Sequence, residues 1–210
     1  MPIDLSRLID PATTAVVTVE CQRGVVGDGA VFPQLVEAVR DSGMIANGTR
    51  VLEAARTAGA HVLHGIAHRR ADRGGQTANC MLLALAMKAP GEGLLPGSAN
   101  AELIPEFGPA ENDFIVPRIH GVTIFHGTEL DSLMRNLGVK TVVLIGVSLN
   151  VAILGSAIEA VNCGYQVVVP RDGTAATPPE YGDAVLQHAL PMVATVTDCE
   201  SIVAAFQPAT

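Results

Sequence analysis

The sequence predicts a three-layer α/β/α, Rossmann-like fold around a central six-stranded, mainly parallel sheet. Short runs of β-branched residues alternate with longer stretches of helical apolar spacing. The strand runs are apolar on both faces, which is typical of a parallel sheet covered by helices on each side. There is no internal repeat or linker, so a single domain over residues 1–210 is expected.

Six strands are expected from the β-branched and apolar runs. The first ends in polar residues at Glu20, and the clearest buried run begins at Lys140 and ends at Gly146. The expected ranges are 14–20, 61–68, 113–117, 140–146, 165–170 and 193–196.

Helical spacing fills the gaps between these strands. Three residues weaken the long stretch 32–58, and Gly59 is expected to stop it. Thr128 is the expected N-cap of a helix that Gly138 ends. The residues expected to interrupt the stretch 32–58 are Gly43, Asn47 and Gly48. Further helices are expected at 77–88, 127–138, 150–162 and 180–189, with a last one at the end of the chain. The Gly- and Pro-rich residues 89–112 are expected to form a surface loop.

Composition excludes several classes of protein. The net charge of −8 and pI near 5.1 give no basic patch for phosphates, so no nucleic-acid partner is expected. The apolar stretch 141–158 is interrupted by Gly and Asn, and no signal peptide opens the chain, so we expect no membrane association. The four cysteines form no Cys-x-x-Cys pair, which indicates reduced thiols and a cytoplasmic location. Only 16% of residues are charged, which favours a homo-oligomer, a dimer or tetramer.

Polar residues gather where the expected parallel strands end, and open sheets bind ligands beyond these carboxyl ends. We therefore expect a small-molecule substrate there. Arginine is permanently charged and binds carboxylates through two parallel hydrogen bonds, so Arg118 is expected to bind either a substrate anion or Glu20. The candidate residues are Glu20, Gln22, His68, Arg118, His120, Ser148, Asn150 and Ala152.

Four segments, in order, carry a family resemblance. Residues 15–22 resemble a first strand that ends in Asp-x-Gln, and residues 118–130 resemble a Lys…Phe-x-Gly-Thr-x-Leu segment. Residues 146–152 resemble a Gly-Val-x-x-x-x-Cys turn, and residues 164–172 the strand and aspartate that follow. Together they resemble the isochorismatase-like hydrolases, or cysteine hydrolase superfamily, over nearly the whole chain. The resemblance implies one isochorismatase-like hydrolase domain.

The family's catalytic set is an Asp, a Lys and a Cys, and this chain differs at all three positions. Glu20 stands at the Asp, Arg118 at the Lys and Ala152 at the Cys. Without a thiol at Ala152, the acyl-enzyme route of the family's amidases is closed. The resemblance implies that true isochorismatases lack the cysteine and keep an acidic residue that protonates an enol ether. Desolvation is expected to raise the pKa of Glu20 for that task; alternatively, Glu20 only pairs with Arg118 and orders the loops.

The remaining candidates each have two interpretations. The turn from Ser148 resembles the family's oxyanion-stabilising amides, with a cis peptide whose counterpart is Val147–Ser148. Asn150 is interpreted mainly as a helix N-cap and Asp172 as a turn cap. Cys21 is interpreted as a packing residue, with a displaced nucleophile as the weaker alternative.

Histidines and arginines near the second strand also have a structural and a functional interpretation. His64 is expected to be a core histidine. The arginines of the 69–73 loop either form a solvated surface or attract an anionic substrate.

Neither a metal nor a cofactor is expected. The nicotinamidase branch of the family has an Asp-x-His pattern after the second strand, and Ile66 occupies its Asp position beside His68. The glycines at 24, 27 and 29 do not form a dinucleotide-binding motif.

Two functions remain open. One is a hydrolase of a small anionic, amide or enol-ether metabolite that uses general acid–base catalysis from Glu20. The other is a catalytically inactive relative that acts in metabolite binding or assembly.

Overall fold

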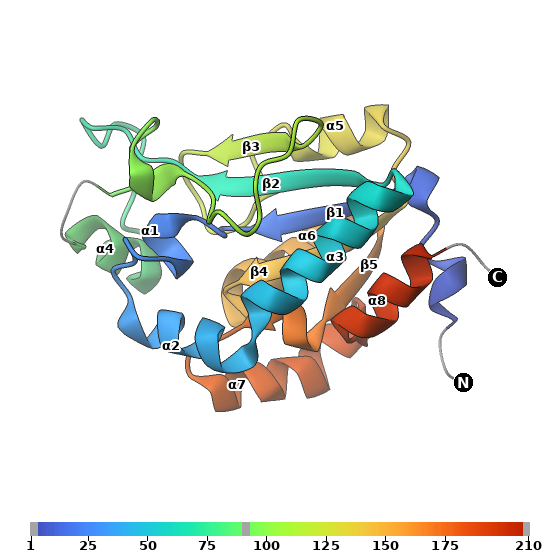
Figure 1. The fold of residues 1–210 in the computed structure, drawn as a ribbon. Coiled ribbons are helices and arrows are strands. Elements are labelled where there is room, and N and C mark those ends of the chain that lie inside the picture. Colours follow the sequence, from blue (N-terminus) through green and yellow to red (C-terminus); the bar gives the residue numbers. More distant parts are fainter. Residues whose placement is uncertain (1–3, 90–92, 208–210) are drawn as a thin grey trace.

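A seven-stranded sheet with the order β3-β2-β1-β4-β5-β7 forms the centre of the molecule (Figure 1). The computed structural model describes residues 4–89 and 93–207. The paired strands all run parallel, and the two-residue β6 adds to the end of β4. The predicted fold class is confirmed, with one strand more than the six expected.

The six expected strands lie within two residues of their predicted bounds. β6 gave no sequence signal because only its pairing with Gly146 and Val147 of β4 defines it as a strand. The strands are β1 (Thr14–Val19), β2 (His61–Ala67), β3 (Phe114–Arg118), β4 (Thr141–Val147), β5 (Gln166–Pro170), β6 (Thr174–Ala175) and β7 (Thr195–Thr197).

Helices connect the strands. The α-helices are α1 (Arg23–Val26), α2 (Pro33–Ser42), α3 (Met44–Ala58), α4 (Met81–Lys88), α5 (Leu130–Asn136), α6 (Leu154–Asn162), α7 (Pro179–Ala184) and α8 (Cys199–Phe206). π-Helical turns precede α6 (Leu149–Ile153) and extend α7 (Val185–Ala189). Short 3-10 helices lie at Leu5–Arg7, Pro11–Thr13, Ala99–Ala101, Arg171–Gly173 and Leu190–Met192.

Two hydrophobic cores sandwich the sheet. Helices α2, α3 and α8 pack on one face, and α3 and α8 lie side by side in front of it in Figure 1. Helices α5, α6 and α7, with its π-helical extension, pack on the other face. The strands contribute alternate residues to the two cores, Val16 to one and Val17 to the other. This double cover explains why the strand runs are apolar on both faces.

The long helical stretch breaks at Gly43 alone, which has a left-handed backbone (φ 67°). The prediction that Asn47 and Gly48 interrupt it is wrong, since both lie inside α3. Gly48 is buried, and a Cβ atom there would lie 2.7 Å from Cζ of Phe107. Because glycine has no side chain, the 104–113 segment can pack closely against α3 at this position. Gly59 ends α3 with φ 78°, as predicted.

The start of α5 also differs from the prediction. Glu129, not Thr128, occupies the N-cap position. The Thr128 hydroxyl instead accepts a hydrogen bond from the Leu130 N–H at 3.2 Å and donates to the Ile124 carbonyl at 2.7 Å. Thr128 therefore joins the helix to the preceding loop.

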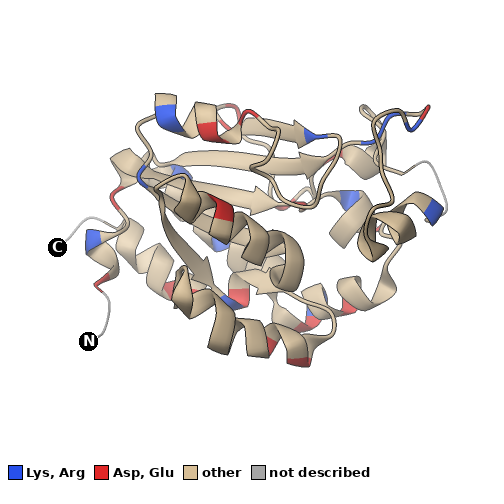
Figure 2. Ribbon diagram, turned by 180° about the vertical axis from the view of Figure 1, so that it is seen from behind, with Lys and Arg blue, Asp and Glu red and all other residues tan. Residues whose placement is uncertain are grey.

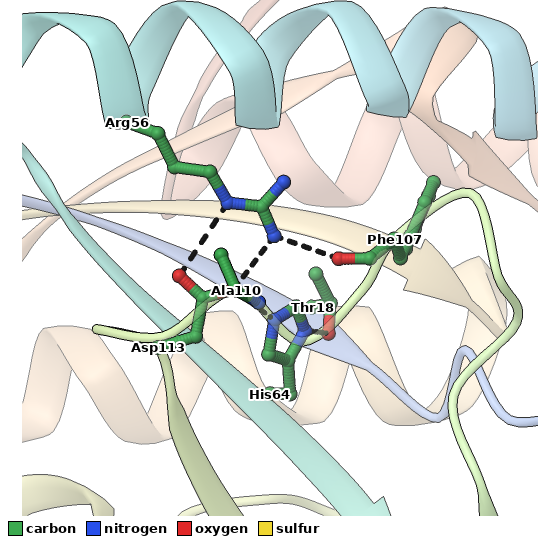
Figure 3. Close-up of polar contacts among 6 residues, drawn as sticks. All are labelled: Thr18, Arg56, His64, Phe107, Ala110 and Asp113. Atoms are coloured by element: carbon green, nitrogen blue, oxygen red, sulfur yellow. Dashed lines mark hydrogen bonds and ion pairs between the residues drawn. The ribbon is translucent and has the colours of Figure 1, made fainter.

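A buried polar network, here called the Asp113 network, ties the chain before β3 to the sheet (Figure 3). The Asp113 carboxylate is 4% exposed and binds Arg56 of α3 at 2.6 Å and His64 Nε2 at 3.1 Å. It also accepts the Ala110 N–H at 2.8 Å. His64 Nδ1 lies 2.8 Å from Thr18 Oγ1 of β1. His64 is thus the satisfied core histidine that was predicted.

Charged residues are sparse, and most of the ribbon in Figure 2 is uncharged. Large apolar side chains are exposed on α4, where Met81 is 80% and Leu85 50% exposed, and on α6, at Ile158 and Val161. No α4 residue is buried. Among the described residues, no helix has the length and apolar character needed to cross a membrane.

Candidate functional site

Glu20 follows β1 directly and turns the chain sharply. Its backbone is left-handed (φ 54°), a conformation that few residues other than glycine adopt. Its N–H still donates to the Gly65 carbonyl at 2.8 Å, so the turn begins on the sheet. The Glu20 side chain is 17% exposed and forms an ion pair with Nη2 of Arg118, the last residue of β3.

Arg118 is held from two sides. Its guanidinium is 5% exposed, and Nη1 donates to the carbonyls of His120 at 3.3 Å and Gly121 at 2.6 Å. Burial lowers the pKa of Arg118 to about 10, so the group stays charged at neutral pH. Of the two partners expected from the sequence, the structure shows Glu20. The adjacent positive charge favours the carboxylate form of Glu20, whereas burial alone disfavours it.

The two histidines at the strand ends reach Arg118 through their backbones. The His68 N–H donates to the Arg118 carbonyl at 2.8 Å, and the His120 carbonyl accepts from the guanidinium. Partial burial lowers the pKa of His68, which favours its neutral form. The His120 ring is exposed and lies edge-on to His126, with 6.3 Å between the ring centroids.

Gln22, which is predicted as a substrate contact, binds backbone groups of two neighbouring segments. Gln22 is fully buried, and its amide Nε2 donates to the carbonyls of Ala67 at 2.9 Å and Ala101 at 3.0 Å. Its Oε1 accepts the Ala67 N–H at 2.7 Å. The side chain therefore continues the edge of β2 and connects it to the 101–103 segment.

The turn after β4 lies beside Glu20 because Val19 pairs with Gly146 in the sheet register. A Cβ atom on Gly146 would come within 2.4 Å of the Val19 carbonyl oxygen, so only glycine allows this approach. The Val147–Ser148 peptide is cis, as the resemblance implies. The Ser148 carbonyl accepts the N–H groups of the π-helical turn, those of Val151 at 3.2 Å and Ile153 at 3.0 Å.

Asn150 is not an N-cap, contrary to the main interpretation of the sequence. It lies inside the π-helical turn, and its Nδ2 donates to the Thr177 carbonyl at 3.4 Å. Its Oδ1 is buried without a hydrogen-bond partner among the described residues. Ala152, two residues on, is 3% exposed and packs in the core of that face.

The remaining predicted positions have structural surroundings. Cys21 is fully buried, burial raises the pKa of its thiol, and Sγ lies 3.5 Å from the Val19 carbonyl. This environment supports packing over the displaced-nucleophile alternative, because the thiolate is the reactive form. Asp172 Oδ1 accepts the N–H of Cys199, the first residue of α8, at 2.8 Å, and Asp198 is the N-cap of this helix. No cluster of three or more His, Cys, Asp or Glu side chains suited to a metal occurs in residues 4–89 and 93–207.

A small cavity near Arg118 contains Gln76, which sequence reasoning did not select, together with Arg69 and His120, which it did. It is lined by Arg69, Gln76 and the carbonyl-bearing loop at His120 and Gly121. Helix α4 closes its other side with Leu83, Ala86 and Met87. Gln76 carries no sequence signal, since a lone glutamine in a polar loop is usually solvated.

The buried Glu20–Arg118 pair lies at the carboxyl ends of the parallel strands, where open α/β sheets bind their ligands, so the chain is an α/β protein with its ligand end at this pair. The chain matches the family model "Isochorismatase domain" over residues 14–201 and belongs to that family.

Three similar proteins extend this result. The chain is 26% identical over 217 residues to the ureidoacrylate amidohydrolase RutB of Agrobacterium fabrum (strain C58 / ATCC 33970), covering 96% of this chain and 95% of that protein. It is 32% identical over 103 residues to the uncharacterized isochorismatase family protein YwoC of Bacillus subtilis (strain 168). This match covers 49% of this chain and about half (53%) of the length of YwoC.

The third is a solved structure. A cysteine hydrolase from Pseudomonas syringae pv. phaseolicola 1448A superposes with a TM-score of 0.79 at 22% identity and covers 95% of this chain and 94% of that chain. At this identity the likeness shows the fold alone. The expectation of an isochorismatase-family hydrolase agrees with the family match and with the amidohydrolase relative.

Proposed function

We propose that this protein hydrolyses a small metabolite carrying an amide or enol-ether bond, with Glu20 as its general acid–base and no cysteine nucleophile. The observation that carries the proposal is the buried Glu20–Arg118 ion pair beside the turn after β4. Few residues other than glycine adopt the backbone conformation of Glu20, and such conformations gather at functional sites.

For an amide substrate, the step begins with Glu20 ionised by its pairing with Arg118. The Glu20 carboxylate takes a proton from a water molecule, whose oxygen bonds to the carbonyl carbon. The tetrahedral intermediate then collapses, the C–N bond breaks, and Glu20 returns the proton to the leaving nitrogen. Backbone N–H groups at the start of the turn, ahead of those of Val151 and Ile153 that donate to the Ser148 carbonyl, are suited to stabilise the oxyanion. Water replaces the thiol because Ala152 has no nucleophilic atom.

The similarity to a ureidoacrylate amidohydrolase over 96% of this chain supports a C–N bond as the target. We propose that this chain forms a homo-oligomer, because only 16% of its residues are charged and α4 is largely exposed. The proposed location is the cytoplasm, because all four cysteines are free thiols.

The test is the Glu20→Gln substitution, assayed with 3-ureidoacrylate and with isochorismate. The amide keeps the shape of Glu20 but does not accept the proton, so kcat/KM should fall about 10²- to 10⁴-fold. Glu102→Gln is the matched control, because Glu102 is an exposed carboxylate that also pairs with an arginine, Arg23. Unchanged turnover in folded Glu20→Gln protein would exclude Glu20 as the acid–base.

The alternative function is metabolite binding or assembly without catalysis. It is favoured by the closure of the Glu20–Arg118 pair, in which the two opposite charges neutralise each other. If the wild-type protein turns over neither substrate but binds one of them, this alternative replaces the hydrolase.

A further inference from the structure

A cavity, here called the β3 groove, lies on the other side of the sheet from the Glu20–Arg118 pair. It has a volume of about 420 Å³, and β2 and β3 contribute Ile66 and Ile115 to its lining. Val116 packs in the core on the side of α5 and α6, so its neighbour Ile115 points to the opposite face of the sheet. Arg118, two residues beyond Val116, shares the face of Val116. The β3 groove is therefore separate from the candidate site.

The outer wall of the β3 groove is the segment 101–109, which crosses in front of β2 in Figure 1. The side chain of Ile115 is 41% exposed, so apolar surface remains open on the strand that faces this wall. Covering such surface with an apolar ligand is favourable in proportion to the area removed from water. The wall residues that line the groove are mostly apolar or small: Ala101, Glu102, Leu103, Pro105, Gly108 and Pro109.

The two charged residues that line the groove, Arg23 and Glu102, pair with each other. Arg23 Nη1 lies 3.5 Å from Glu102 Oε2, and Arg23 also binds Asp28 through two hydrogen bonds at 3.0 and 2.7 Å. Both charges of the described lining thus have partners already. A charged ligand would lose its hydration there without gaining a free counter-ion. The lining therefore favours an uncharged molecule.

The dimensions of the groove distinguish a small molecule from a protein partner. Nine described residues line it, whereas a stable protein interface involves about 20–30 residues on each side. Small-molecule pockets typically have volumes of roughly 300–1,000 Å³, and the volume of about 420 Å³ falls in this range. The groove therefore fits a small molecule.

We propose that the β3 groove is a binding site for a small, uncharged, largely apolar molecule, separate from the site at Glu20. The inference goes beyond the proposed hydrolysis and does not depend on it. The apolar body of the ligand packs between Ile66 and Ile115 of the sheet and Leu103 and Pro105 of the wall.

The wall of the groove is bonded to the chain that leaves β1. The Ile104 N–H donates to the Cys21 carbonyl at 3.0 Å, and the Arg23 N–H donates to the Glu102 carbonyl at 2.9 Å. A ligand held against the wall should therefore also shift the backbone signals of Cys21 and Arg23.

The test titrates ¹⁵N-labelled protein with 2-naphthol and, separately, with 2-naphthoate, which is an anion at neutral pH. 2-Naphthol should shift the backbone signals of Leu103 and Ile115 together with those of Cys21 and Arg23. 2-Naphthoate should bind at least about 10-fold more weakly, because the anion finds no free cation in the groove. Ile115→Asp should weaken 2-naphthol binding at least about 10-fold, since it places a carboxylate against the apolar ligand.

Ile158→Asp is the matched control, because Ile158 has a similar exposed fraction, 44%, but lies on α6 on the other face of the sheet. It should leave 2-naphthol binding unchanged. Ile115→Trp fills the groove without adding a charge and suits a strand, so it should also weaken binding and decides the result if Ile115→Asp does not fold. No shift at Leu103 and Ile115, equal binding of 2-naphthoate, or equal weakening by Ile158→Asp would overturn the site.

Discussion

Single residues decide how the strand ends become a site. Glu20 was placed correctly by the pattern of β1, but the pattern contained nothing about its left-handed backbone, which turns the carboxylate toward Arg118. For Gln22, the sequence indicated a polar residue at the strand end but not its partners. Its amide forms hydrogen bonds with backbone groups of Ala67 and Ala101. Position relative to a strand end is readable from sequence, whereas the partner that satisfies each polar atom depends on loops distant in the chain.

The Asp113 carboxylate should contribute strongly to stability. Asp113→Ala removes the partner of the half-buried Arg56 guanidinium and of the buried His64 ring. The substitution should lower the free energy of unfolding by about 3 kcal/mol. Urea denaturation gives this difference. Asp72→Ala is the control, because its pair with Arg70 is exposed to solvent and should contribute little. Equal effects of the two substitutions would contradict the role of the Asp113 network.

His64 should make stability depend on pH. Burial, with a smaller contribution from Arg56, lowers the pKa of His64, and the neighbouring Asp113 only partly opposes this shift. The unfolded chain therefore takes up a proton near pH 6.5 that the folded chain resists, so stability is full above that pH and falls as pH drops below it. The lowered pKa of Asp113 adds a loss in the same direction below about pH 4.

This dependence can be measured as the free energy of unfolding at about pH 7.5 and pH 5.5. His64→Gln removes the titrating ring that faces Thr18, Asp113 and Arg56. It should be less stable at both pH values but lose less on acidification than the wild type. A wild type that is equally stable at both values would refute the assignment.

At the scale of elements, helix α3 illustrates packing that overrides propensity. Gly48 to Ala should stabilise an isolated helix by about 1 kcal/mol. In this protein the added methyl group meets the buried Phe107 ring, so we expect a net destabilisation of about 1–2 kcal/mol, a fall in Tm of roughly 2–8 °C. Calorimetry measures it. Phe107→Leu in the same chain should recover part of the loss; strictly additive effects would argue against the contact.

The elements that sequence predicted well are those with their own local signal. The β-branched run before Gly146 and the stop at Gly59 each reflect a backbone preference, and both were found. Gly48 was misread because its close packing against Phe107 involves a residue nearly sixty positions away. Asn47 was misread because its side chain donates to the distant Asp172 carbonyl. Asn150 was misread because a π-helical turn replaces the ordinary first turn of α6.

For the whole molecule, the low charged fraction of 16% predicts a homo-oligomer, in which a second subunit covers apolar surface. Helix α4 exposes Met81, Leu82 and Leu85 and contains a single charged residue, Lys88. Sedimentation velocity should show a dimer or tetramer, and Leu85→Glu should shift it toward the monomer by placing a charge in the apolar surface. A wild type that sediments as a monomer at every concentration would disprove the prediction.

The order of the strands has a consequence for how the chain is made on the ribosome. β1 emerges first but lies in the middle of the sheet, between β2 and β4. Its edge toward β4 has no partner until Thr141–Val147 leaves the exit tunnel, after two thirds of the chain has been synthesised. A nascent chain or fragment that stops before Thr141 therefore presents an apolar strand edge, the kind of surface that chaperones bind and that aggregates.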